Sequence, residues 1–137
     1  MKEFRGYREL KMSKKPISLI QNIIVDKASK EGIIIDRIIL FGSRARGNYR
    51  RESDWDIAII TNNKLEKSTF WDFYITVKRE LTKNGIPTDI IIIPKSTFEK
   101  KKKIIGNVAY YANKEGKIIW KKSSKKSEDG LEKPMMI

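Results

Sequence analysis

Residues 38–60, IILFGSRARGNYRRESDWDIAII, decide how this chain folds, because they place two apolar runs on either side of a polar loop. The first run, 38–41, stops at Gly42-Ser43, which predicts a buried strand that feeds a turn. The second run, 55–60, predicts another strand. Alternation along that strand places Asp54, Asp56, Ala58 and Ile60 on one face, and Trp55, Ile57 and Ile59 on the other. Two acids at the start of so apolar a strand need a chemical explanation.

Helical and extended segments surround this stretch. Pro16 suits the first turn of a helix, and apolar residues then recur at three- and four-residue spacing. Two patterns of the capping-box type, Thr69 with Asp72 and Ser96 with Glu99, predict the starts of two later helices. We therefore expect helices from Pro16 to Gly32, over 68–83 and over 96–112, and further strands over 88–93 and 117–120.

The chain has 137 residues and a formal charge of +13. That length suits one domain, expected over 16–120, between a basic extension at 1–15 and a mobile tail at 121–137. Nearly half of the excess positive charge lies in the two flanks, so contact with nucleic acid is a secondary expectation. With neither a signal peptide nor an apolar run of the roughly 18 residues that span a bilayer, we expect a soluble cytoplasmic protein without membrane contact.

The chain contains no histidine and no cysteine. Their absence excludes disulfides, thiolate nucleophiles, most zinc sites and every mechanism in which imidazole is the general base. Any chemistry must then use carboxylates, hydroxyls, amines and a hard cation.

The two acids of the second strand fit such a cation. Side chains at i and i+2 of a strand project from one face, so Asp54 and Asp56 can converge on a shared ion. Carboxylate ligands without His or Cys favour Mg²⁺ or Mn²⁺ over Zn²⁺, and two such ions can orient an attacking oxygen and neutralise a triphosphate. Asp89, a lone acid in the apolar strand 88–93, would complete a three-carboxylate site and could accept the proton of the nucleophile.

The Gly-Ser turn fits a phosphate. Gly42 allows close approach to a phosphate, the backbone N–H groups at this helix start favour negative charge, and the Ser43 hydroxyl can donate to the same oxygens. Arg44 and Arg46, with Arg50 and Arg51, are candidates for further phosphate contacts, and the sequence does not choose among them.

These motifs together resemble the minimal nucleotidyltransferases of the DNA polymerase β superfamily. The resemblance rests on Gly42-Ser43-Arg44-Ala45-Arg46-Gly47, on Ser53-Asp54-Trp55-Asp56-Ile57 and on Thr88-Asp89-Ile90-Ile91, and it covers roughly residues 17–120. The family spacing of Gly-Ser, ten residues and Asp-x-Asp is matched without a gap. The resemblance implies an α/β (α+β) fold of the polymerase β type, with a small mixed sheet packed against helices.

The resemblance also implies a reaction and a partner. The reaction is Mg²⁺-dependent transfer of AMP from ATP or another NTP to a hydroxyl, with release of pyrophosphate. By motif position, Gly42 and Ser43 would bind phosphate, and Asp54, Asp56 and Asp89 would be catalytic and would hold two Mg²⁺ ions, or Mn²⁺. Many such proteins are antitoxins that adenylylate a helical HEPN toxin, which is the expected partner. This chain is not itself that toxin, whose motif requires histidine.

Two other functions stay open. One is transfer to a small molecule, as in aminoglycoside-modifying enzymes, which usually carry a second domain that holds the acceptor. Here a second copy in a homo-oligomer could supply that part of the binding site. The other is a non-catalytic module that binds a nucleotide, RNA or a partner through its basic surface. Lys100 to Lys103 are interpreted as the solvated face of a helix, and Tyr110 and Tyr111 as surface or interface residues.

Overall fold

The computed structural model describes residues 2–122, with side chains from residue 15 onward. The predicted tail therefore lies outside the described residues, except for its first two positions. The elements follow in the order α1 (Lys2–Lys30), β1 (Ile35–Phe41), α2 (Gly42–Arg46), β2 (Trp55–Thr61), α3 (Lys67–Lys83), β3 (Thr88–Pro94), α4 (Lys95–Lys101), α5 (Val108–Glu115) and β4 (Lys117–Lys121). Within this part of the chain, no helix combines the length and apolar character needed to cross a bilayer.

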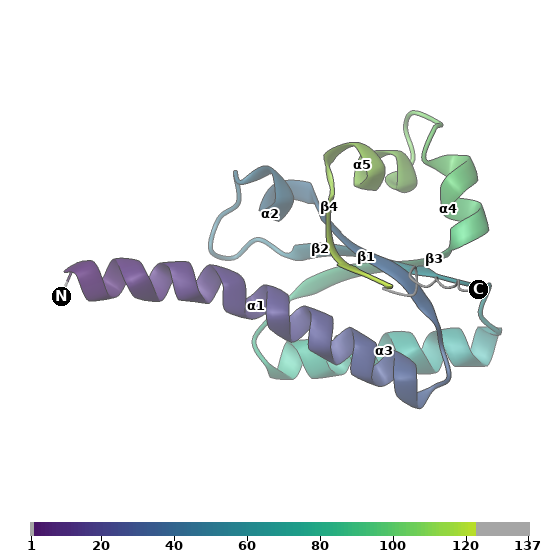
Figure 1. Ribbon diagram of the computed structural model, residues 1–137, viewed down its shortest axis with the longest axis horizontal. Helices are drawn as coiled ribbons and strands as arrows, with labels where there is room; N and C mark the ends of the chain where they lie inside the picture. Colours follow the sequence, from purple (N-terminus) through teal and green to yellow (C-terminus); the bar gives the residue numbers. More distant parts are fainter. Residues whose placement is uncertain (1, 123–137) are drawn as a thin grey trace, which may run out of the picture.

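The four strands form one mixed sheet in the order β3-β2-β1-β4. Strand β1 pairs antiparallel with β2 and with β4, whereas β2 and β3 are parallel and are connected through α3. Figure 1 shows α1 and α3 on one face of the sheet and α4 and α5 on the other. The predicted α/β class with a small mixed sheet is confirmed.

Each face of the sheet buries its own apolar cluster, so the central strand β2 is covered on both sides. Trp55, Ile57 and Ile59 pack with residues of α1 and α3, including Ile24, Phe73 and Val77. Ala58 and Ile60 pack with residues of α4 and α5, namely Phe98, Ala109 and Ala112. The two faces predicted for this strand from alternation are confirmed. Burial on both faces fixes the register, because a slip by one residue would turn every side chain to the wrong side.

The first helix differs from the prediction, because it does not begin at Pro16. It runs from Lys2 to Lys30 with the proline inside it, and Figure 1 shows its first half extending beyond the sheet. Proline removes one backbone hydrogen bond, but its fixed φ is helical, so the chain can continue as a helix on both sides of it. At the other end, Ile33 N–H donates to the carbonyl of Ala28, and Gly32 takes a positive φ of 71°.

The two predicted capping boxes are also wrong. Helix α3 begins at Lys67 after Glu66, and α4 begins at Lys95 after Pro94, and neither flanking residue makes a side-chain capping bond. Thr69 and Ser96 therefore lie inside the first turn rather than before it.

The single helix predicted over 96–112 is instead two helices. Helix α4 ends at Lys101, Gly106 in the turn that follows has a φ of 103°, and Asn107 starts α5 by accepting a hydrogen bond from the N–H of Tyr110 at 3.2 Å. The sequence signal for this break was the glycine itself.

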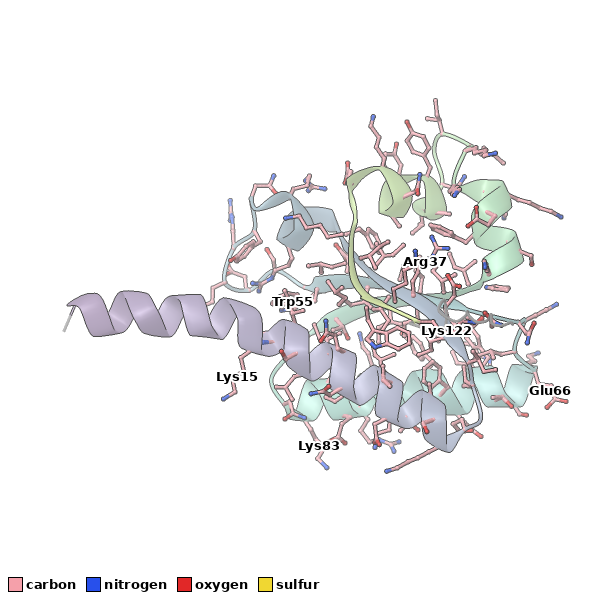
Figure 2. All side chains as sticks on the ribbon, viewed as in Figure 1. Lys15, Arg37, Trp55, Glu66, Lys83 and Lys122 are labelled. Carbon is pink, nitrogen blue, oxygen red and sulfur yellow. The ribbon has the colours of Figure 1, made fainter. Side chains whose placement is uncertain are left out.

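A buried acid attaches α4 to the start of β1. Asp36 is 6% exposed and lies 2.6 Å from Nε of Arg37 and 3.6 Å from Nζ of Lys95. Arg37, labelled in Figure 2, also reaches Glu99 of α4 at 3.5 Å. Burial pushes the pKa of Asp36 upward, but the hydrogen bond from Arg37 and the charges of Arg37 and Lys95 outweigh it and hold that pKa below its usual value.

Replacement of this acid tests its contribution to stability. Because its pKa is lower in the folded state, Asp36 stabilises the fold above the unfolded-state pKa of about 4, and this contribution is lost as the pH falls. We expect Asp36→Asn to reduce the free energy of unfolding at pH 7 by about 1–3 kcal/mol, with a smaller difference from the wild type at pH 3. Urea denaturation at the two pH values measures both. Asp26→Asn, which removes an exposed pair with Lys30, is the control and should change stability by less than about 0.5 kcal/mol. A pH-independent difference for the Asp36 variant would contradict this account.

Candidate active site

Parallel pairing of β2 with β3 brings two of the predicted acids side by side. In this register Asp56 lies opposite Asp89, and Trp55 lies opposite Thr88. Neighbouring residues of in-register parallel strands project from the same face, so the two carboxylates share one face of the sheet. Asp54 precedes β2 by one residue and is exposed, as is Asp89, whereas Asp56 is half-buried. Trp55, labelled in Figure 2, marks the end of β2 at which the acids gather.

The half-buried acid is electrostatically strained. Burial raises the pKa of Asp56, and the negative charges of Asp89 and Asp54 raise it further. The positive charge of Arg46 opposes them only in part. A divalent cation between these groups would relieve the repulsion, because each carboxylate would gain an opposite charge.

The Gly42 backbone forms a tight cover over Asp56. Phe41 is the register partner of Asp56 across β1 and β2, so the turn after β1 passes directly over the carboxylate. A Cβ atom built on Gly42 would lie 1.9 Å from Oδ2 of Asp56. The φ of Gly42 is also positive, at 74°. No residue with a side chain fits here without moving the acid, and this cradle places the predicted phosphate turn against the predicted metal ligands.

The rest of the phosphate turn is the short helix α2. Ser43 lies in its first turn and is half-buried, and Phe41, the residue at the N-cap, makes no side-chain capping hydrogen bond. The first N–H groups of a helix have no intrahelical acceptor, so those at the start of α2 are available to a phosphate. These predicted phosphate donors lie beside the acids. Phosphate binding by Gly42 and Ser43 stays a prediction.

The two arginines predicted to contact phosphate, Arg44 and Arg46, have protein partners in the structure. Arg44 donates to the carbonyls of Ser53 and Arg51 at 2.9 and 3.0 Å, and its guanidinium lies between the rings of Tyr49 and Trp55, 4.3 and 4.5 Å from their centroids. These contacts fasten the loop that leads into β2, so Arg44 positions Asp54 through the backbone.

Arg46 has a different partner. Its guanidinium pairs with Glu115 of α5 at 3.0 Å, and its charge reaches Asp56. Contact of Arg44 and of Arg46 with phosphate stays a prediction.

The sequence did not indicate the residues that line a cavity next to Asp54. A cavity of about 380 Å³ lies beside Asp54 and is also lined by Lys78, Thr88 and the turn that contains Pro87. Lys78 donates to the carbonyl of Thr88, the residue before Asp89. The Thr88 hydroxyl is buried, and no hydrogen-bond partner is recorded for it among the described residues. Lys78 is one of many lysines, so no sequence pattern distinguished it.

Asp54, Asp56 and Asp89, which we call the acidic edge, form a donor set that fits a hard divalent cation. It offers carboxylate oxygens alone, burial and the charges of Asp89 and Asp54 raise the pKa of Asp56, and the Gly42 backbone lies against the Asp56 carboxylate. The side chains are not drawn together on one point: among residues 15–122 no group of three or more acids forms a closed metal cluster. Asp54, Asp56 and Asp89 as metal ligands therefore stay a prediction.

Comparison with known proteins identifies the family to which this fold belongs. The sequence profile of the family described as "Polymerase beta, Nucleotidyltransferase" matches residues 20–125. This chain belongs to that family and is an enzyme of the nucleotidyltransferase class.

Several known proteins are similar to this chain. A curated protein of Methanocaldococcus jannaschii, "Putative protein adenylyltransferase MJ0604", is 34% identical over 89 residues, which are 63% of this chain and 79% of the relative. A crystal structure of a "putative nucleotidyltransferase" from Sulfolobus solfataricus has the same fold, with a TM-score of 0.55 and 22% identity, over 83% of this chain and 87% of the other. A Shewanella oneidensis complex of a tri-AMPylated HEPN toxin with MNT antitoxin matches at a TM-score of 0.47 and 17% identity, over 80% and 76%.

The Gly42 cradle gives a direct test of the site. We expect Gly42→Ala to lose stability from the positive φ, about 1–2 kcal/mol, and to displace the Asp56 carboxylate as well. Gly32→Ala is the matched control, because Gly32 has nearly the same φ, 71°, with nothing within 4 Å of an added Cβ. Thermal unfolding should show a loss in both variants. Titration with Mn²⁺, followed by electron paramagnetic resonance, should show weakened binding only for Gly42→Ala. Equal Mn²⁺ affinity in the two variants would contradict the cradle.

Proposed function

We propose that this enzyme transfers AMP from ATP to a hydroxyl group of a protein, with Mg²⁺ and with release of pyrophosphate. The observation that carries the proposal is the pairing of Asp56 with Asp89, next to Asp54, directly beneath the Gly42-Ser43 turn. The name of the Methanocaldococcus jannaschii relative supports a protein as the acceptor.

The chemistry divides among these residues. The oxygen of the acceptor hydroxyl forms a bond to the α-phosphorus of ATP, the bond between the α-phosphorus and the bridging oxygen breaks, and pyrophosphate leaves. Asp54, Asp56 and Asp89 would hold Mg²⁺, which offsets the charge of the triphosphate and of the leaving pyrophosphate. The Gly42-Ser43 turn would bind phosphate oxygens through its N–H groups and the Ser43 hydroxyl. Asp89, which is exposed on the edge strand β3, would accept the proton of the acceptor hydroxyl.

We infer that the acceptor is a HEPN-type toxin and that this chain is the antitoxin of the pair. The inference rests on the sequence resemblance to minimal nucleotidyltransferases, many of which adenylylate such a toxin. It also agrees with the open acidic edge, where Asp54 and Asp89 are exposed to a macromolecular acceptor.

Loss of two acids tests the proposed reaction. The protein is incubated with Mg²⁺, ATP labelled at the α-phosphate and a candidate HEPN toxin, and transfer of label to the toxin is measured. The double variant Asp54→Asn, Asp56→Asn should lower the transfer rate about a hundredfold or more, because the charge that holds the metal is removed.

The matched control is Asp72→Asn, which neutralises an exposed acid on α3, and it should transfer at the wild-type rate. Absence of transfer by the wild type, or equal transfer by the double variant, would overturn the proposal. Transfer to an aminoglycoside but not to protein would favour the small-molecule alternative.

A further inference from the structure

The connection between α4 and α5 exposes apolar side chains that the core does not use. Ile104 and Ile105 are 57% and 75% exposed, and Val108 and Tyr111 at the start and middle of α5 are 46% and 42% exposed. We call these four residues, with the exposed lysines Lys100, Lys101 and Lys103, the α4–α5 patch. In Figure 1 it lies at the top of the molecule, on the face opposite α1 and α3.

The exposure of the two isoleucines is built into the turn. The amide of Asn107 donates to the carbonyl of Lys101 at 3.1 Å and to that of Ile104 at 2.6 Å, and its oxygen caps α5. The same helices bury Phe98, Ala109 and Ala112 against the sheet. The inward faces are therefore filled, and the hydrogen-bonded turn holds Ile104 and Ile105 on the outside.

Positive charge predominates along the stretch that carries the patch. Residues 100–114, KKKKIIGNVAYYANK, contain five lysines and no acid. Lys102 is already paired, at 2.7 Å from Glu99. For Lys100, Lys101 and Lys103, no ion pair is recorded with any side chain between residues 15 and 122. Apolar groups within a rim of unpaired cations complement a surface with an apolar centre and an acidic rim.

The patch is continuous with the active site through α5. Glu115, at the end of this helix, pairs with Arg46 of α2, and the charge of Arg46 acts on Asp56. The helix has eight residues and spans about 12 Å, so a macromolecule lying along it would reach from the patch to the Glu115–Arg46 pair beside α2.

We propose that the α4–α5 patch docks the protein acceptor through an acidic, partly apolar surface of that acceptor. This inference rests on the proposed function and adds to it a recognition site separate from the reacting groups. A protein is favoured over RNA because three of the four exposed apolar side chains, Ile104, Ile105 and Val108, are aliphatic and cannot stack bases, which leaves Tyr111 as the one aromatic side chain of the patch. A protein is favoured over a lipid surface because it can carry the acceptor hydroxyl to the acids along α5.

The binding test uses a copolymer of glutamate and tyrosine, which is acidic, partly apolar and rich in hydroxyl groups. Binding is measured by fluorescence anisotropy without ATP, at about 0.15 M salt so that long-range attraction by the net charge is screened. The triple variant Lys100→Glu, Lys101→Glu, Lys103→Glu should bind at least about tenfold more weakly than the control Lys64→Glu, Lys67→Glu, Lys83→Glu. The control makes the same change in charge at exposed lysines on and beside α3.

A second pair of variants tests the apolar part. Ile104→Ser with Ile105→Ser should weaken binding about threefold or more, whereas Ile34→Ser with Ile75→Ser, at similarly exposed positions, should leave it unchanged. With ATP and Mg²⁺, the lysine variant of the patch should raise the KM for AMP transfer to the copolymer and leave kcat nearly unchanged.

Three outcomes separate the hypotheses. Equal loss in the patch and control variants would overturn the docking site and show attraction by net charge alone. Patch-dependent binding of a uridine 20-mer or of phosphatidylglycerol vesicles, without patch-dependent binding of the copolymer, would overturn it in favour of RNA or a membrane. Patch-dependent copolymer binding without AMP transfer to the copolymer or to a HEPN toxin would overturn the proposed function and support the docking surface.

Discussion

The in-register parallel pairing of β2 with β3 is the constraint on which the rest of the site depends. It sets Asp56 beside Asp89 on one face, where like charges repel and burial raises the pKa of Asp56 further. Such an arrangement is costly unless the surrounding structure holds it in place. The hydrophobic clusters on both sides of β2 fix the position of this strand. The Gly42 backbone, which follows β1, packs against the Asp56 carboxylate. The strain is concentrated at the one edge where a divalent cation would relieve it.

Much of this architecture could be predicted from the sequence, because apolar runs and alternation report burial directly. The strands predicted from the apolar runs agree with those of the structure to within a few residues, and the two faces of β2 follow from the alternation that begins at Asp54. The errors lie where local signals compete with tertiary packing. Pro16 is a common helix start, yet here it lies within α1. Thr69 and Ser96 match capping patterns, yet the helices begin two residues and one residue earlier.

Contacts between distant residues could not be predicted in the same way. Arg44 is one of four arginines in a polar loop, and only the folded loop shows its guanidinium between Tyr49 and Trp55. Glu115 becomes relevant only because α5 packs beside α2 and meets Arg46. The sequence predicts a solvated helix face over Lys100 to Lys103, but α4 ends at Lys101, and Lys103 is exposed in the turn that follows. What the sequence did not show is that the isoleucines after them are held outward by Asn107.

The central claim is that the acidic edge and the Gly-Ser turn form one cation-dependent site, and paramagnetic relaxation by Mn²⁺ tests it most directly. Mn²⁺ broadens the backbone amide signals of residues close to it, so a titration of ¹⁵N-labelled protein maps where the ion binds. The account predicts that signals of residues 42–43, 54–57 and 88–90 broaden first, and that Asp56→Asn removes the effect. Broadening that begins instead at surface acids such as Asp26 and Asp72, or that is unchanged by Asp56→Asn, would contradict it.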